Sequence, residues 1–123
     1  MKKQVILGIV LLCAPLFATA AKNASIPKMF LGHWEPSQET CNNVLKNGDA
    51  QSDMGVVITA KEVSRYESSC ELQSIGQITA TSMQGTFNCG SSEEMWESTF
   101  SLVLQNNQLF AGPEADPLVK CKK

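Results

Sequence analysis

The residues that could perform acid–base chemistry are few in this sequence. His33 is the only histidine, so one chain cannot build a site from several histidines. Glu93, Glu94 and Glu97 surround Trp96 and could supply the two carboxylates that a glycosidase uses. The first two of them, however, lie in a polar stretch, which is typical of a solvated acidic turn. This cluster therefore does not predict an active site.

Nucleophilic catalysis and metal binding are not indicated either. No serine occurs in a Gly-x-Ser-x-Gly motif, and the single histidine leaves one possible base. Asp49 and Asp53 lie near Asn47 and Gly48, but their spacing misses the pattern of a calcium-binding loop. We therefore expect no enzymatic activity, no metal and no cofactor.

The N-terminus has the layout of a secretory signal peptide. Two lysines precede an apolar run over residues 5–12, and Ala-Thr-Ala at residues 18–20 supplies the small residues of a cleavage site. We expect residues 1–20 to be removed on export. The short, lysine-led form of this signal is typical of bacteria and predicts a periplasmic or secreted protein.

Export decides how the cysteines must be interpreted. Four remain after removal of residues 1–20, namely Cys41, Cys70, Cys89 and Cys121. An even number in a short exported chain predicts two disulfides. Three pairings are possible. If the strands follow one another as a meander, Cys70 and Cys89 lie on neighbouring strands while Cys41 and Cys121 lie near the first and last, and this is the pairing we favour.

Length and charge restrict the domain organisation and the partners. Removal of residues 1–20 leaves 103 residues and takes away two of the 10 basic side chains. The exported chain then carries 12 acidic and 8 basic side chains, a net charge of −4. This charge argues against nucleic acid and anionic membranes as partners, and no second apolar run reaches the roughly 20 residues of a membrane span. We expect a flexible tail over residues 21–28, one domain over residues 29–123, and a monomer.

The spacing of turns predicts an all-β domain. From Met29 onward, turn residues recur at short intervals, and about eight antiparallel strands would form a meander that closes into a barrel or half-barrel. The clearest alternation covers residues 96–105, where the even-numbered side chains are mostly apolar. Asn106-Asn107 suits a two-residue type I′ turn that would place Leu104 opposite Leu109.

The same alternation predicts which side chains face the interior. Cys89 shares a face with Phe87, and Cys121 shares one with Val119, so both cysteines are expected on the apolar side. A turn is expected at residues 83–85. The chain from residue 37 to residue 53 is polar and is expected to be a long loop with one helical turn after Ser37.

One strand does not alternate clearly. Val63 and Arg65 share one face, and Tyr66 lies on the other. We favour the arrangement in which Tyr66 points inward and Val63 is exposed. In the alternative, Arg65 and Glu67, which is on the same face, enter the interior as a pair, because a buried unpaired charge is costly.

The first strand carries a Gly-x-Trp motif, Gly32-His33-Trp34. This motif resembles the opening of lipocalins and other calycins such as the avidins. In that family the glycine permits a close bend, the tryptophan closes the base of the barrel, and a basic residue near the last strand packs over the tryptophan. The resemblance implies that Lys120 or Lys122 has this place here.

The wider layout is similar to that of small two-disulfide periplasmic proteins of proteobacteria. In these a Gly-x-Trp opens the domain and a cysteine nearly ends it. Some barrels of this size are periplasmic lysozyme inhibitors. The Ser-Gly-x-x-Tyr inhibitory loop of the C-type lysozyme inhibitors is not found in this sequence.

Binding proteins are the class that these exclusions leave. An acidic domain suits a basic partner, so we favour an inhibitor of a cell-wall hydrolase or an immunity protein against an exported toxin. Contacts are expected from two polar segments, at residues Asn42, Asn43, Lys46, Asn47 and Asp49 and at residues Ser91, Glu93 and Glu94.

Two other functions remain open at this point. A small lipocalin-like carrier of an apolar ligand would need an open interior, and an eight-stranded barrel holds one small ligand at most. The side chains expected to fill that space are Phe87, Trp96, Phe100, Leu102, Leu104 and Val119. An envelope structural or stress-related protein is the other alternative.

Overall fold

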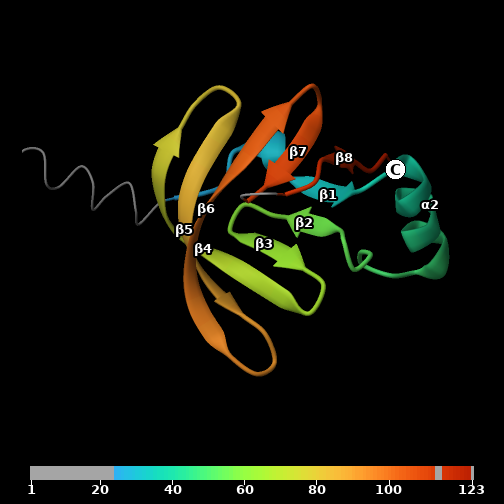
Figure 1. Cartoon of the computed structure of the whole chain (residues 1–123), viewed down its shortest axis with the longest axis horizontal. Coiled ribbons are helices and arrows are strands. Elements are labelled where there is room, and N and C mark those ends of the chain that lie inside the picture. Colours follow the sequence, from blue (N-terminus) through green and yellow to red (C-terminus); the bar gives the residue numbers. More distant parts are fainter. Residues whose placement is uncertain (1–23, 113–114, 123) are drawn as a thin grey trace, which may run out of the picture.

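The computed structural model describes residues 24–112 and 115–122, so the predicted signal peptide lies outside the described residues. Within them, eight antiparallel strands pair in chain order, and β1 also pairs with β8 to close a barrel (Figure 1). The strands are β1 (Gly32–Glu35), β2 (Val56–Ile58), β3 (Glu62–Arg65), β4 (Ser68–Ile78), β5 (Ser82–Gly90), β6 (Met95–Gln105), β7 (Gln108–Ala111) and β8 (Leu118–Lys120). The predicted all-β meander barrel is confirmed.

The connections between strands alternate between the two ends of the barrel, because successive strands are antiparallel. The end that we call the open end carries the connections 36–55, 66–67, 91–94 and 112–117. The end that we call the closed end carries the turns 59–61, 79–81 and 106–107. In Figure 1 the β4–β5 and β6–β7 turns lie at the top, and the β5–β6 turn lies at the bottom.

The N-terminal segment fills the closed end. The short 3₁₀ helix η1 (Lys28–Phe30) leads into β1, and Ala24, Ile26 and Phe30 are all buried. The backbone N–H of Ile26 donates to the carbonyl of Ala60 at 2.7 Å. Residues 24–28 are therefore packed against the barrel, whereas the sequence predicted a flexible tail over residues 21–28.

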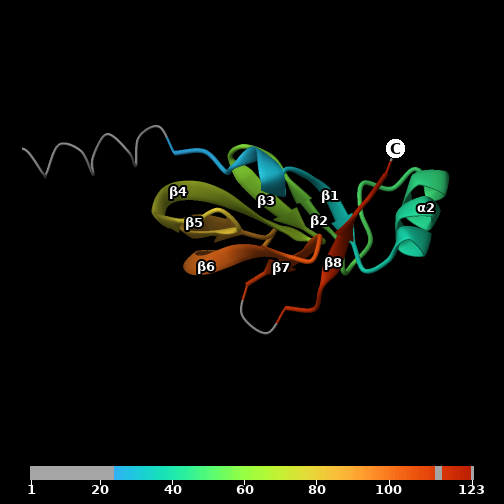
Figure 2. The ribbon, with the colours of Figure 1, turned by 90° about the horizontal axis from the view of Figure 1, so that it is seen from above.

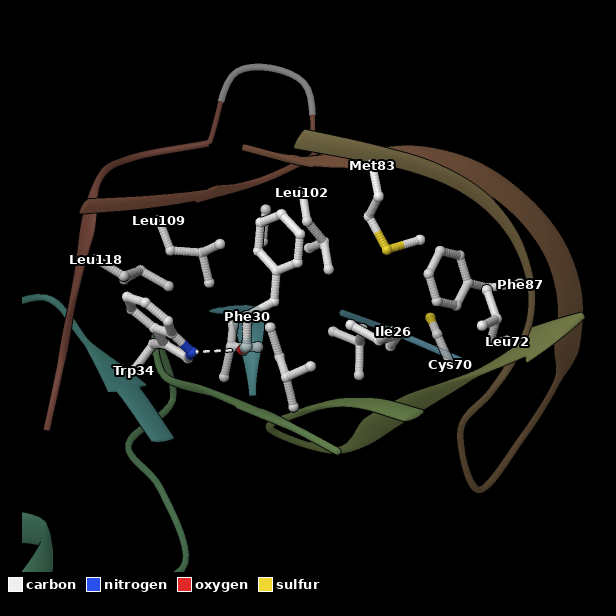
Figure 3. Close-up of a cluster of buried hydrophobic side chains, with 14 of the residues drawn as sticks. Ile26, Phe30, Trp34, Cys70, Leu72, Met83, Phe87, Leu102, Leu109 and Leu118 are labelled. Carbon is white, nitrogen blue, oxygen red and sulfur yellow. Dashed lines mark hydrogen bonds between the residues drawn. The ribbon is translucent and has the colours of Figure 1, made fainter. Parts of the chain in front are cut away.

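The interior of the barrel is filled by side chains. Figure 3 shows Phe30 between Trp34 and Leu102, and the indole N–H of Trp34 donates to the carbonyl of Phe30 at 2.9 Å. Other large buried side chains are Val56, Ile58, Val63, Met83, Phe87 and Leu109. Burial of this apolar surface is the main stabilising contribution to a domain of this size.

The polar segment after β1 forms a helix, α2 (Gln38–Asn47), where a loop with one helical turn was predicted. The hydroxyl of Ser37 accepts from the N–H of Thr40 at 3.1 Å, and Gly48 ends the helix with a φ of 78°. Serine is a favoured residue at the N-cap of a helix, and glycine is favoured where a helix ends. In Figures 1 and 2, α2 lies beside β1 and β8, away from β4 to β6.

The two disulfides have the favoured pairing. Cys41 of α2 is bonded to Cys121, which follows β8, and Cys70 is bonded to Cys89. Cys70 and Cys89 are opposite each other on β4 and β5, with Cα atoms 3.9 Å apart. This bond therefore joins directly opposite residues of two neighbouring strands.

Two local predictions are wrong. Residues 83–85 lie inside β5, and the turn falls earlier, at residues 79–81. In β8 it is Leu118 that is buried, while Val119 pairs with Glu35 and is only half-buried. Cys121 is bonded to Cys41 of α2, outside the barrel. The face that Cys121 shares with Val119 is therefore the outer face, not the predicted apolar one.

The predicted hairpin between β6 and β7 is confirmed. Asn106 and Asn107 have φ values of 54° and 64°, as a type I′ turn requires, and Leu104 pairs with Leu109.

Candidate functional site

Arg65 reaches the interior at the open end. It pairs with Val56 of β2 and Ser68 of β4, and Val56 is fully buried, so the three side chains share the inner face. One guanidinium N–H of Arg65 donates to the carbonyl of Ala111 at 2.8 Å. Burial lowers the pKa of Arg65 below its ordinary value, but an arginine remains charged at neutral pH.

The favoured arrangement of this strand was wrong. Val63 is fully buried, whereas Tyr66 is 57% exposed in the turn after β3. Glu67 continues that turn with a φ of 64° and points to solvent. Among the described residues, no carboxylate forms an ion pair with Arg65. The guanidinium therefore keeps N–H donors that face the opening.

A cleft of about 290 Å³ lies beside Arg65. Its lining includes Trp96, Ser98 and Phe100 of β6, Ser68 and Cys70 of β4, and Ala111 with Gly112 next to β6. Phe100 is backed by Phe87, because their rings stack with centroids 4.2 Å apart. Trp96 is 40% exposed, so the expectation that it fills the interior is wrong. The cleft combines one cation with exposed aromatic surface.

A second cleft, of about 690 Å³, opens on the other side of Arg65. Residues 49–53 form one wall, and Arg65, Tyr66 and Glu67 form the other. Arg65 lines both clefts, so the two clefts are neighbours at this end of the barrel. We call the surface of the two clefts the open-end surface.

Carboxylates surround the open-end surface. Eight exposed acidic side chains lie on the described parts of the connections at this end or on the first residues of β6, namely Glu39 of α2, Asp49, Asp53, Glu67, Glu93, Glu94, Glu97 and Asp116. Within the described residues, Lys46 of α2 is the lysine of these connections, whereas Lys61 is in a turn of the closed end, Lys28 in η1, and Lys120 and Lys122 at and after the end of β8. The open end therefore carries an excess of exposed carboxylates.

Glu35 holds the β1–β2 connection in place. Its side chain is fully buried on the outer face of β1. The carboxylate accepts hydrogen bonds from the Ser52 backbone N–H at 2.9 Å, from the Ser52 hydroxyl, and from His33 Nε2 at 2.5 Å. A Cβ atom on Gly55 would collide with this carboxylate, so the close approach requires glycine.

These hydrogen bonds set the ionisation of Glu35. Burial raises the pKa of Glu35, but the hydrogen bonds from Ser52 and the contact with His33 outweigh burial, so the pKa lies below 4.5. The side chain is therefore a carboxylate at neutral pH. It fixes residues 49–53, which form one wall of the open-end surface.

The predicted contact residues fall into two groups. Asn42, Asn43, Lys46 and Asn47 are exposed on α2, and Asp49 follows the helix. Ser91, Glu93 and Glu94 are exposed in the β5–β6 turn. Figure 1 shows α2 and this turn well apart. The open-end surface includes Asp49, Glu93 and Glu94 among its acidic residues, but most of the α2 residues lie outside it.

The most distinctive residues of the surface were not selected from the sequence. Arg65, Tyr66 and Trp96 come from three different positions in the chain, and only the register of β3 to β6 brings them to one end. The signal for Arg65 was the interrupted alternation at residues 63–67, where a charge shares a face with a buried valine.

The Gly-x-Trp motif lies toward the closed end. Gly32 has a φ of 133°, and a Cβ there would lie 2.7 Å from Cε of Lys120. The ammonium of Lys120 is 5.7 Å from the centre of the Trp34 ring, within the range of a cation–π contact. Lys120, one of the two lysines considered, thus packs over the motif tryptophan.

Comparisons with protein-family models, with curated proteins and with solved structures found no match for this chain. Within the described residues, no helix has the length and apolar character needed to cross a membrane. The same residues contain no group of three metal-ligating side chains. The two disulfides fit an extracellular or periplasmic protein.

Proposed function

We propose that this protein is an exported, non-enzymatic binding protein whose open-end surface binds a basic protein. The partner class we favour is a cell-wall hydrolase, which the domain would inhibit, or an exported toxin, against which it would act as an immunity protein. The predicted signal peptide and the two disulfides support the periplasm as the compartment.

One observation carries this proposal. Arg65, Tyr66 and Trp96 belong to the residue types that dominate binding energy at protein interfaces, and all three lie at one end of the barrel. Exposed carboxylates surround them and would attract a basic partner during the encounter. The predicted contacts at Glu93 and Glu94 belong to this acidic border, where charges affect the association rate most.

The carrier function has less support. The barrel interior is occupied by Phe30, Met83, Phe87 and Leu102, all buried. The larger cleft, beside residues 49–53, is lined mainly by polar and charged side chains, which do not suit an apolar ligand. The contacts among Gly32, Trp34 and Lys120 support a calycin-like closed end, which is compatible with either function.

The test is direct binding of the exported domain to purified basic proteins. A panel of basic cell-wall hydrolases and toxins, with C-type lysozyme among them, is compared with cytochrome c as a basic protein that is neither. We expect at least one panel member to bind with a Kd of about 1 µM or tighter, and cytochrome c to bind at least about tenfold more weakly. Equal binding of all the proteins, or binding of none, would contradict the proposal.

Substitutions identify the surface that binds. We expect Trp96→Ala and Arg65→Met each to weaken the binding by about 30-fold, as loss of a major interface contact does. Leu45→Ala is the matched control, because Leu45 is 66% exposed on α2, outside the open-end surface. If Leu45→Ala weakened binding as much as Trp96→Ala, the binding face would be α2 instead.

A further inference from the structure

The first half of β6 has an unpaired edge. On one side β6 pairs with β5 along the whole length from Met95 to Val103. On the other side, the pairing with β7 begins only at Leu102. Among the described residues, no strand pairs with Met95–Phe100 on that side, and Glu97, Trp96 and Met95 are exposed. This edge is at the open end and borders the cleft beside Arg65.

The hydrogen-bond pattern shows which backbone groups face this edge. The carbonyl of Ser101 accepts from Gly112, so the backbone groups of Ser101 face β7. The N–H of Leu104 donates to Thr81, so the even-numbered residues face β5. Because the direction alternates along a strand, the N–H and C=O groups of residues 95, 97 and 99 point out from the open edge. Antiparallel strands rise about 3.4 Å per residue, so this edge is roughly 20 Å long.

We propose that the partner adds an extended segment to this edge of β6 as a further antiparallel strand. The inference rests on the proposed function, because it takes the segment to belong to the basic partner. Strand addition uses main-chain hydrogen bonds for affinity and alternate side chains for specificity. Residues 95, 97 and 99 supply the donors and acceptors, and the cleft supplies the space for side chains.

The two faces of β6 specify the chemistry of the added segment. Residues opposite Trp96, Ser98 and Phe100 would point into the cleft, where apolar side chains fit against the aromatic rings. Residues opposite Met95, Glu97 and Thr99 would point outward, where a lysine or arginine can pair with Glu97. The segment therefore alternates apolar and basic residues over about six positions.

A second copy of this chain fits the edge poorly. Two β6 edges in antiparallel contact would bring Glu97 of each copy, with Glu93 and Glu94 of the adjacent turn, toward like charges on the other copy. Like charges on paired strands are destabilising. The charge of the edge thus favours a basic segment.

The test uses two synthetic hexapeptides with blocked ends, Val-Lys-Val-Lys-Val-Lys and Val-Glu-Val-Glu-Val-Glu, with amide hydrogen exchange of the domain measured by NMR. With the lysine peptide, we expect the exchange of the Glu97 and Thr99 amides to slow at least about tenfold. The amides of Ser98 and Phe100, which already face β5, should not change. The glutamate peptide should protect none of them.

Thr99→Pro tests the role of the backbone N–H. Proline is tolerated on an edge where the N–H has no partner, so the variant should fold and lose peptide binding. Thr99→Ala, which removes the hydroxyl contact with Thr86 but keeps the N–H, should bind as the wild type does.

Three outcomes would overturn the proposal: uniform protection along β6, equal binding of both peptides, or protection of the same amides by a dimer without peptide. The test contains no partner protein. A negative result with the basic-protein panel would therefore refute the proposed function without affecting the peptide result. A negative peptide result would refute strand addition without affecting the result with the panel.

Discussion

Glu35 is a buried charge and Arg65 a half-buried one, and their surroundings differ. The carboxylate of Glu35 has three hydrogen-bond donors and no exposed surface, so it has a structural role. Arg65 is half-buried, and within the described residues its side chain donates to the carbonyl of Ala111. A cation that is held in place but still has free donors is well suited to contact another molecule.

The ionised state of Glu35 should stabilise the fold in a pH-dependent manner. Its pKa is lowered in the folded state, so its contribution is present above the unfolded value of 4.5 and is lost as pH falls through the folded pKa. We expect Glu35→Gln to lower the free energy of unfolding by about 1–3 kcal/mol near neutral pH. Urea unfolding at several pH values measures this.

The free energies of unfolding of the wild type and of Glu35→Gln should also be compared below pH 4.5. The difference between wild type and Glu35→Gln should shrink as pH falls below 4.5, because the wild-type carboxyl becomes protonated. A difference that stayed constant across this range would show that the charge of Glu35 does not contribute.

Side-chain placement was predictable only where the alternation was regular. The pairing of Leu104 with Leu109 followed from a clear pattern and a turn of two asparagines. The roles of Arg65 and Trp96 could not be predicted in this way. The pattern of a strand indicates which face a side chain is on but not how far it lies from the end of the barrel. Trp96 is on the inner face, yet it is so near the opening that 40% of it stays exposed.

At the scale of elements, α2 depends on its ends more than on its apolar face. Only Cys41 and Val44 are buried, so the helix has a narrow contact with the barrel. The signals that could have predicted it were Ser37 at the start and Gly48 just past the end, which are typical N-cap and C-terminal residues. The low apolar content of the segment concealed them.

Removal of the N-cap tests this view of α2. We expect Ser37→Ala to lower the free energy of unfolding by about 1 kcal/mol, because the Thr40 N–H loses its acceptor. Asn42→Ala, at an exposed position within the helix, is the matched control and should change stability little. Chemical denaturation measures both. An equal effect of the two substitutions would contradict the capping role.

At the scale of the whole molecule, the two disulfides have the pairing that the predicted strand order favours. Cys41–Cys121 closes a loop with a sequence separation of 80, and Cys70–Cys89 one of 19. The preferred pairing could be predicted because a meander places Cys70 and Cys89 on adjacent strands. The outward direction of Cys121 could not, because it depends on the position of α2 outside the barrel.

The two disulfides should contribute unequally. Chain-entropy arguments give about 4.5 kcal/mol for the longer loop and about 3 kcal/mol for the shorter. We expect the double variant Cys41→Ala with Cys121→Ala to melt at a lower temperature than the double variant Cys70→Ala with Cys89→Ala. Calorimetry decides the order. An unchanged melting curve in either double variant would refute a stabilising role for that bond.

The charge distribution also acts at this scale. The excess of carboxylates at the open end would orient a basic partner before contact. We expect Glu93→Lys with Glu94→Lys to slow association with a basic partner several-fold at low salt, with little change in the dissociation rate. Stopped-flow kinetics at two salt concentrations measures this. An unchanged association rate would exclude steering by this turn.

The central claim is that the open end of the barrel is the binding face. The most direct measurement is a hydrogen-exchange footprint of the domain alone and with the basic protein of the panel that binds most tightly. We predict protection of residues 49–53, 65–68 and 95–100, which form or border the open-end surface. Protection confined to the closed-end turns at 59–61, 79–81 and 106–107, or to α2, would contradict it.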